Sequence, residues 1–290
     1  MQKTIWDKYA EVLVDYSTDV QKGDLVQIRA TSIYAKDLVK AVYKRVIQKG
    51  AHPILRTSFE DFSDIFIKYA SDEQLDYIDP IIKQEYETVN KFISIGAPMN
   101  TKNMARADLS KLARRSKASQ GLSKTLMDRT AKGEASWVIA DVPTHALAQE
   151  AKMSFDEYAE FLFKSCYLDL DDPVAKLREL DEKQNKWANY LNNVKKVRIV
   201  GDRTDITFGV EGRKWISCSG VNNYPDGEVF TSPVEDDING EIYFDFPQNY
   251  RGNSATGVHL WIENGKIVSF EAETGKDYLE AMFNMDEGSK

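Results

Sequence analysis

The chain has 290 residues, of which 42% are hydrophobic and 29% are charged, and its formal net charge is −8. These values are typical of a globular protein long enough for two domains, and they exclude a disordered or fibrous chain. The negative charge argues against nucleic acid as the main partner. No run of about 18 apolar residues predicts a membrane span, and no apolar stretch near residue 1 resembles a signal peptide. We therefore expect a soluble cytoplasmic protein.

The first part of the chain alternates between strand and helix patterns. Short apolar runs predict strands at residues 25–30, 53–57, 91–97 and 137–140. The apolar spacing between residues 35 and 47 predicts a helix that ends at Gly50. This alternation favours a mostly parallel sheet with helices on both faces. An opening helix should pack on this sheet through Ile5, Tyr9, Leu13 and Tyr16.

Two further helices close this part. Ser154 and Glu157 have the spacing of a capping box, which predicts a helix start. Asp172-Pro173 predicts another start, because proline suits the first position of a helix. The apolar spacing that follows predicts a helix that ends near Asn193. We therefore predict an N-terminal α/β domain at residues 1–193.

From residue 194 onward the pattern is that of antiparallel strands. Runs rich in β-branched and aromatic residues occur at 197–200, 206–210, 242–246 and 258–262. Asn264-Gly265 predicts a tight hairpin, because both residues tolerate the positive φ angles of a type I′ turn. We predict a second, antiparallel β-rich (α+β) domain at residues 194–290, incomplete, with a short helix at 278–283.

The common catalytic signatures are absent. The sequence contains no GxSxG, no P-loop, no HExxH and no GxGxxG. Its only cysteines, Cys166 and Cys218, form no CxxC, so we expect neither a disulfide framework nor a thiolate zinc site. The three histidines, His52, His145 and His259, share no metal-ligand spacing, so we expect each to be structural or exposed.

Two charged stretches allow a functional and a structural interpretation. A basic stretch between residues 102 and 117 could contact phosphate or RNA. We favour a solvated helix face whose buried side is Met104, Leu109 and Leu112, because no aromatic residues accompany the charges. Residues 169–172 (Asp-Leu-Asp-Asp) resemble a metal-binding DxD. We favour a helix cap before Pro173, because acidic groups are stable at the positive end of a helix.

Glu228 is the one candidate metal ligand. It follows Gly227 and leads into Val229-Phe230, which we expect to be at least partly buried. A carboxylate beside apolar surface is costly unless it is paired or bound to a cation, and a divalent ion is a natural partner. On spacing alone, a salt-bridged or exposed glutamate at a strand start remains the favoured alternative.

The segment around Glu228 carries a family resemblance. The pattern Asn223-x-Pro225-x-Gly227-Glu228-Val229-Phe230-Thr231-x-Pro233-Val234-Glu235-Asp236 resembles the signature of the thermophilic aminopeptidase family, the M29 metallo-aminopeptidases. Two other stretches are similar to the same family, and the likeness runs over the whole chain in order. They are residues 148–161 with Asp171-Asp172-Pro173, and residues 204–208 with 210–213.

The resemblance implies both a fold and a function. The fold would be an N-terminal α/β domain followed by an antiparallel, metal-binding C-terminal domain. The function would be that of a metal-dependent aminopeptidase with two divalent ions (zinc, cobalt or manganese), and Glu228 matches the first ligand position. Two such ions lower the pKa of a shared water, and the resulting hydroxide attacks the peptide carbonyl. The implied partners are peptides with a free N-terminus and a second copy of the chain, in a homodimer.

The resemblance also implies ligands that this sequence does not match. In the family a second Glu, two His, an Asp and a neighbouring Tyr follow an Asp-Glu-Gly element, which here is Asp286-Glu287-Gly288. We therefore expect the 290 residues to lack most of the metal ligands, to retain no metal and to be inactive by themselves. One alternative is a non-catalytic binding or assembly module. A weaker one is a phosphate-binding α/β protein, which needs an anion at a helix N-terminus.

Overall fold

The computed structural model describes residues 3–250, 253–284 and 288. Its internal contacts divide the chain into two compact units. One unit comprises Met1–Asp181 and Cys218–Gly227, and the other comprises Glu182–Ser217 and Glu228–Lys290. The division falls within helix α9 (Pro173–Leu191). The predicted boundary at residues 193/194 stays a prediction.

The first unit contains a five-stranded parallel sheet with the order β2-β1-β3-β4-β8. The four predicted strands share this sheet, which confirms the prediction. The fifth strand was not predicted, because two residues carry no strand pattern; it pairs with the edge of β4 through Ile139 and Asn223. The strands are β1 (Leu25–Ala30), β2 (His52–Thr57), β3 (Lys91–Gly96), β4 (Ser136–Asp141) and β8 (Asn223–Tyr224).

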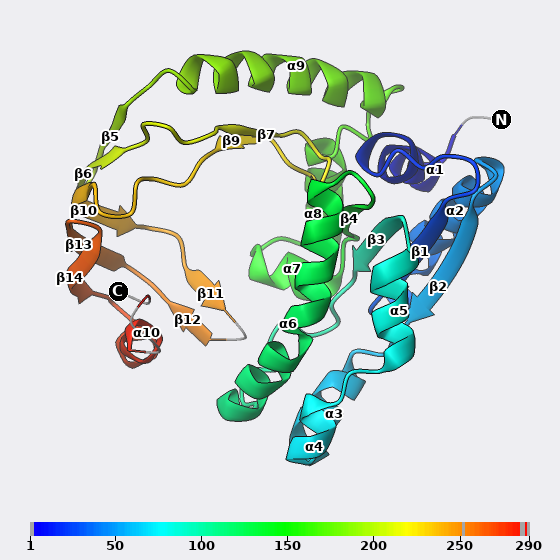
Figure 1. Cartoon of the computed structure of the whole chain (residues 1–290), viewed down its shortest axis with the longest axis horizontal. Coiled ribbons are helices and arrows are strands. Elements are labelled where there is room, and N and C mark those ends of the chain that lie inside the picture. The colour runs from blue at the N-terminus through cyan, green and yellow to red at the C-terminus, as the bar shows by residue number, and fades with distance from the viewer. Residues whose placement is uncertain (1–2, 251–252, 285–287, 289–290) are drawn as a thin grey trace. The chain divides into compact units, whose positions relative to one another are not determined.

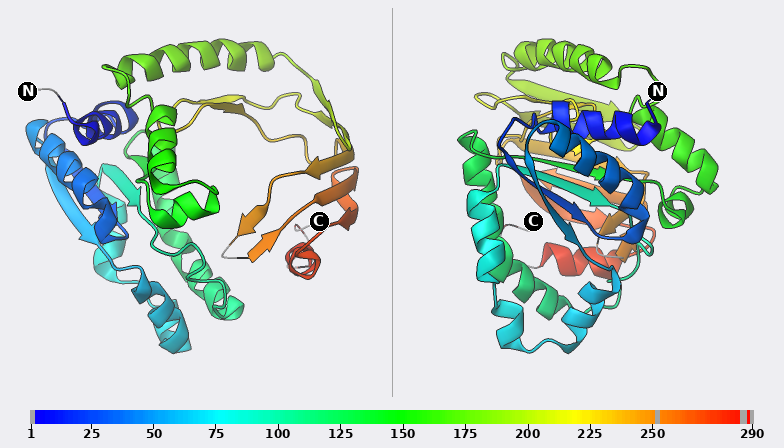
Figure 2. Two further views of the ribbon diagram at one scale, coloured as in Figure 1. Left: turned by 180° about the vertical axis from the view of Figure 1, so that it is seen from behind. Right: turned by 90° about the vertical axis from the view of Figure 1, so that its right-hand side faces the viewer.

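Helices pack on both faces of this sheet, as predicted. Alternate strand residues such as Ile28 and Ile93 belong to a large core that also contains Leu13 and Leu38 from two of the helices. On the opposite face, Phe92 packs with side chains that include one from α6. Figures 1 and 2 show the elements. The helices are α1 (Ile5–Glu11), the π-helical turn η1 (Val12–Ser17), η2 (Ile33–Ala35), α2 (Lys36–Gln48), α3 (Asp61–Tyr69), α4 (Asp72–Asp76), α5 (Pro80–Thr88), α6 (Leu109–Ala131), α7 (His145–Glu150), α8 (Phe155–Ser165) and α9.

The predicted helix starts are confirmed. Ser154 and Glu157 form a reciprocal capping box at the start of α8. At the start of α9, the backbone N–H of Ala175 donates to Oδ1 of Asp172 at 2.9 Å. This bond supports the interpretation of the Asp-Leu-Asp-Asp stretch as a helix cap.

The second unit contains an antiparallel sheet with the order β14-β13-β10-β6-β5. The predicted hairpin is confirmed: Asn264 and Gly265 have φ angles of 48° and 76°, as a type I′ turn requires. Leu279 of the short C-terminal helix packs with Val258 in a small core. The elements are β5 (Lys196–Gly201), β6 (Thr204–Gly209), β10 (Ile238–Phe244), β11 (Gln248–Tyr250), β12 (Asn253–Ala255), β13 (Val258–Glu263), β14 (Lys266–Glu271) and α10 (Lys276–Phe283).

Asp286 and Glu287, which match the family's Asp-Glu-Gly element, lie outside the described residues. Within the described residues, every helix is too short or too polar to cross a membrane. The cytoplasmic location stays a prediction.

Candidate metal centre

The segment that carries Glu228 is held at its base by buried contacts. Tyr224 is buried, its ring lies 5.3 Å from the ring of Tyr9, and its hydroxyl donates to the carbonyl of Cys166. The side chain of Asn222 donates to the carbonyl of Trp137 at 3.3 Å. The Tyr224–Pro225 peptide bond is cis. These contacts fix the start of the turn that leads to Asp226 and Glu228.

The end of this turn is held by a short strand pair and by one buried amide. Strands β7 (Ile216–Cys218) and β9 (Glu228–Phe230) form a two-stranded sheet. Gln184 of α9 is buried, and its Nε2 donates to the backbone carbonyl of Glu228 at 3.0 Å. Its Oε1 accepts from Oγ of Ser217 at 3.3 Å. The Gln184 side chain therefore bonds to both strands and fixes the backbone from which the Glu228 side chain extends.

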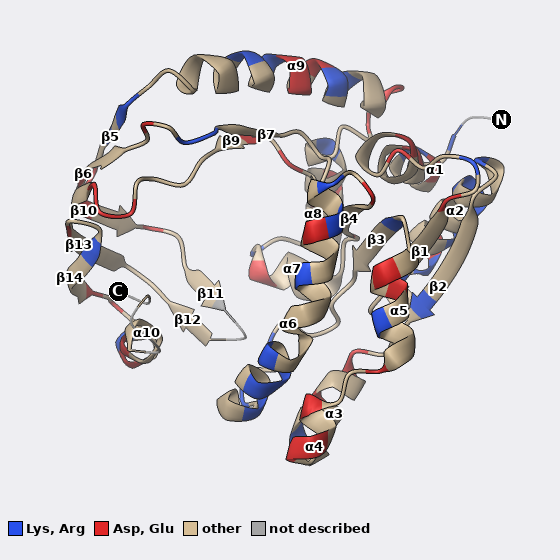
Figure 3. Ribbon diagram, in the orientation of Figure 1, with Lys and Arg blue, Asp and Glu red and all other residues tan. Residues whose placement is uncertain are grey.

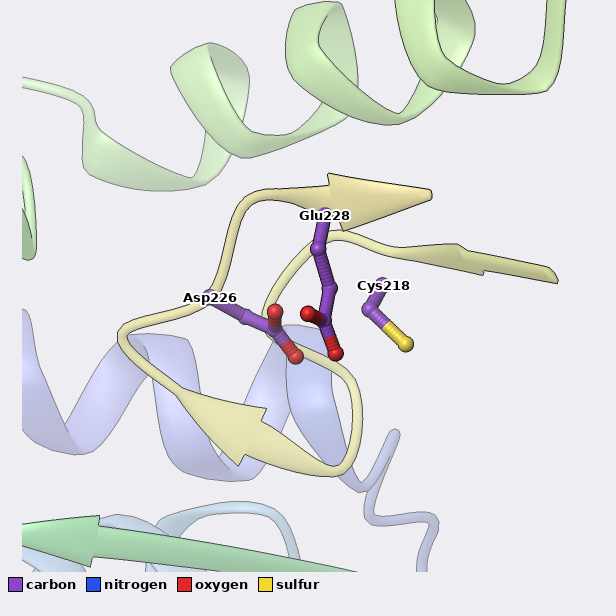
Figure 4. A group of neighbouring side chains, drawn as sticks. All are labelled: Cys218, Asp226 and Glu228. Carbon is purple, nitrogen blue, oxygen red and sulfur yellow. The ribbon is translucent and has the colours of Figure 1, made fainter. Parts of the chain in front are cut away.

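Three potential metal ligands converge in this segment. Ligand atoms of Cys218, Asp226 and Glu228 all lie within 4.8 Å of one another. Figure 4 shows the carboxylates of Asp226 and Glu228 next to each other, with the Cys218 side chain on the other side of Glu228. Asp226 lies on the turn after β8, and Glu228 is the first residue of β9. Cys218 and Asp226 are half-buried and Glu228 is exposed. Within the described residues, no other group of three or more His, Cys, Asp or Glu side chains could hold a metal ion.

The sequence argument from burial is wrong for Glu228. Its side chain is exposed, Val229 is only half-buried, and Phe230 is exposed. Water therefore solvates this carboxylate, and burial by itself creates no demand for a cation. What supports a cation site is the approach of Asp226, because two carboxylates whose oxygens lie within 4.8 Å of each other can share one divalent ion.

Sequence reasoning missed Asp226 and Cys218. Asp226 stands at an unassigned position of the family pattern, and Cys218 was set aside because it belongs to no CxxC. The thiol and the carboxylates come together because β7 pairs with β9. Spacing along the chain gives no signal for such a pairing.

The donor set fits a borderline divalent ion. A thiolate suits zinc and softer ions, whereas carboxylates suit harder ions, so one thiol and two carboxylates together suit zinc or cobalt better than manganese. Ligands of a tetrahedral zinc ion lie roughly 3.5 Å apart, so the side chains would have to draw together slightly. Three protein donors are enough to hold one ion that keeps an open position, and too few to hold two.

The three histidines lie elsewhere. His52 is exposed at the start of β2, and the ring of His145 lies 4.7 Å from the ring of Phe155. Nε2 of His259 lies 3.0 Å from a carboxylate oxygen of Glu241. The partners of His145 and His259 agree with the expected structural roles.

The basic stretch on α6 has a structural role that sequence analysis did not foresee. Lys111 donates to the carbonyls of Lys68 and Ala70 at the end of α3, and Arg115 donates to two carbonyls at the end of α4. Farther along, Arg129 does the same for α5. Cations at these positions satisfy the last carbonyls of three helices and interact favourably with the helix dipoles.

Charges on α6 also pair with acidic neighbours. Arg114 bonds to Asp72 and Asp76 of α4, and Figure 3 shows the cations of α6 beside the acidic residues of α3 and α4. These contacts favour the structural interpretation over phosphate or RNA binding. One detail of that interpretation is wrong: Leu109 is exposed, because it lies at the first turn of α6 beyond the small core that Leu112 joins.

Comparisons with known proteins agree along the whole chain. The family model described as thermophilic metalloprotease (M29) matches residues 2–290. Aminopeptidase 2 from Geobacillus stearothermophilus is 30% identical over 311 aligned residues, which cover 98% of this chain and 74% of that protein. Aminopeptidase AmpS from Bacillus subtilis (strain 168) is 25% identical over 304 aligned residues, which cover 97% of this chain and 73% of that protein. Wild-type AmpT from Thermus thermophilus, 20% identical, has the same fold, with a TM-score of 0.83 over 98% of this chain and 75% of that chain.

Proposed function

The chain belongs to the thermophilic metalloprotease family M29, and from this premise we propose that the protein is a metal-dependent aminopeptidase that releases N-terminal amino acids from peptides. The observation that carries the proposal is the family match over residues 2–290, which includes the Gly227-Glu228-Val229-Phe230-Thr231 element. The relatives that match over nearly the whole chain bear the name aminopeptidase, which supports this activity over a purely binding role.

We propose Glu228 as a metal ligand, with Asp226 and Cys218 as the side chains that complete its part of the site. Their convergence within 4.8 Å supports this assignment. A pair of divalent ions supplies Lewis acidity that polarises a peptide carbonyl and activates water. Since three donors are too few for two ions, we predict that the 290 residues alone hold at most one ion, weakly, and do not retain it through dialysis.

Two further residues would position the Glu228 side chain and leave space beside it. Gln184 holds the backbone of Glu228, which limits how far the carboxylate can move. Gly227 has no positive φ, and a Cβ built on it would meet no atom within 4 Å. The fold therefore does not require glycine here. We propose that its missing side chain leaves room for the first residue of a peptide substrate.

The proposed partners are peptides with a free N-terminus and a second copy of the chain. A free amine distinguishes an aminopeptidase from an endopeptidase, because the enzyme must recognise the ammonium or amine of the first residue. We propose a homodimer as the working assembly, in line with the family resemblance.

The experiment is a peptide assay on the complete gene product. A tripeptide and its N-acetylated form are incubated with the protein and added zinc, cobalt or manganese, and released amino acids are quantified. The proposal predicts release from the free peptide, at least tenfold slower release from the acetylated one, and loss of activity in Glu228→Gln. The control is Glu263→Gln, which changes an exposed carboxylate at the end of β13. No release with any of the three metals, or equal release from both peptides, would overturn the proposal.

A further inference from the structure

Helix α3 exposes an apolar stripe. Phe62, Ile65, Phe66 and Tyr69 recur at the spacing of one helix face, and each is between 39% and 71% exposed. Phe59, just before the helix, extends the stripe, and its ring stands edge-on to Phe62 at 5.7 Å. Such a stripe normally packs against the protein core. In α3 the buried residue is instead Ile67, on the opposite side of the helix, where it packs with Ala70 and Leu75 in a small core.

The stripe is large enough to support an interface. Aromatic side chains bury roughly 150–250 Å² each, so the exposed parts of these five residues amount to on the order of 500 Å². That is at the upper end for an apolar patch on a monomer, and such patches often mark interaction sites. Two such stripes placed face to face would cover about 1,000 Å², the lower limit of a specific interface.

The charges beside the stripe are complementary to a second copy of themselves. Asp61 and Lys68 lie seven residues apart, about two turns, and therefore fall on the same flank of α3. Within the described residues, neither makes an ion pair. When two α3 helices pack antiparallel about a two-fold axis, Asp61 of each copy faces Lys68 of the other. The positive N-terminal end of each helix dipole then lies beside the negative C-terminal end of the other, which is a favourable arrangement.

We propose that the stripe formed by Phe59, Phe62, Ile65, Phe66 and Tyr69 is where a second copy of this chain docks, with α3 packed antiparallel on α3 of the partner. The acidic residues around the stripe, Glu60, Asp61 and Asp64, disfavour an anionic lipid surface as the occupant. This inference rests on the proposed homodimer but not on the peptidase chemistry.

The first test measures the dimer dissociation constant by sedimentation of the complete gene product over a dilution series. Phe62→Ser and Tyr69→Ser should each raise this constant at least tenfold. The matched control is Phe161→Ser, which changes another exposed helical phenylalanine of the first unit, on α8. Circular dichroism should show native helix content in all three variants, which separates loss of the interface from loss of the fold.

The second test uses the charges. Asp61→Lys and Lys68→Glu should each weaken the dimer, and the double variant should recover most of the loss because the pairs across the two-fold axis are restored with reversed sign. A monomeric wild type overturns both the homodimer and this inference. A wild-type dimer whose dissociation constant is unchanged by the α3 variants overturns this inference alone. Peptide hydrolysis is measured separately, so failure of the aminopeptidase proposal leaves the result for α3 unaffected.

Discussion

Arg129 makes the most concentrated set of helix-capping contacts on α6. Its side chain is only 13% exposed, and its Nη1 donates to the carbonyls of Tyr86 at 2.9 Å and Val89 at 2.7 Å, at the end of α5. Hydrogen bonds from a charged donor contribute about 1.5–3 kcal/mol each. The ion pair with Glu134 adds little, because its two atoms lie 3.8 Å apart and the Glu134 carboxylate is exposed to water. We expect Arg129→Met to lower the free energy of unfolding by about 3 kcal/mol.

The assay is thermal unfolding followed by circular dichroism. For a unit of 150–250 residues, 1 kcal/mol corresponds to about 2–4 °C, so the midpoint should fall by roughly 6–12 °C. The midpoint of Arg129→Lys should lie between those of wild type and Arg129→Met, because an ammonium group lacks the planar guanidinium fork that reaches several carbonyls. The control is Lys124→Met, which removes an exposed ion pair with Asp128 on the same helix and should cost about 0.5 kcal/mol or less. If Arg129→Met melts within about 2 °C of Lys124→Met, the capping argument is wrong.

Three further predictions concern single residues. Burial raises the pKa of the Cys166 thiol to about 12, so in native protein at pH 8 a thiol reagent should modify Cys218 and leave Cys166 unreacted until the protein unfolds. Zinc should slow the modification of Cys218, because a thiol that binds the ion is shielded from the reagent. Gly265→Ala should lower the free energy of unfolding by about 1–3 kcal/mol in a denaturant titration, because Gly265 has a φ of +76° and a Cβ there would lie 1.6 Å from a backbone oxygen. As the control, Gly227→Ala should change this free energy by less than about 1 kcal/mol, because a Cβ at Gly227 would meet no atom within 4 Å. A hydrogen bond from Arg114 of α6 holds the pKa of Asp76 below its usual 3.8, so the ionised carboxylate stabilises the fold at neutral pH and this stabilisation is lost as the pH falls through the lowered pKa. Asp76→Asn should therefore lower the melting temperature at pH 7 and not at pH 2.

Much of the fold could be predicted because its elements have local signals. The parallel strands are apolar runs such as Leu25–Ala30, and the hairpin depends on the φ angles of Asn264 and Gly265. Local signals do not predict which other element a helix or strand packs against. The spacing in α3 indicates an apolar face, but it does not show that this face is exposed. The pattern of basic residues on α6 does not show that Arg129 and its neighbours bond to the ends of other helices.

The candidate site was predictable only in part. Glu228 was found through the family pattern, whereas the physical argument for it, burial beside an apolar strand, is wrong because its side chain is exposed. Asp226 and Cys218 could not be found from the sequence, since their approach to Glu228 depends on the pairing of β7 with β9. A pairing of two three-residue strands leaves no periodic pattern in the sequence.

Zinc titration of the 290-residue chain by calorimetry tests most directly whether Glu228 is a metal ligand. The structure predicts that zinc binds to at most one site, and that Glu228→Gln weakens binding at least tenfold because a charged ligand becomes neutral. The control Glu263→Gln should bind as wild type does. Equal affinity in wild type and Glu228→Gln, or no zinc binding by the wild type at millimolar zinc, would contradict the assignment of Glu228 as a ligand.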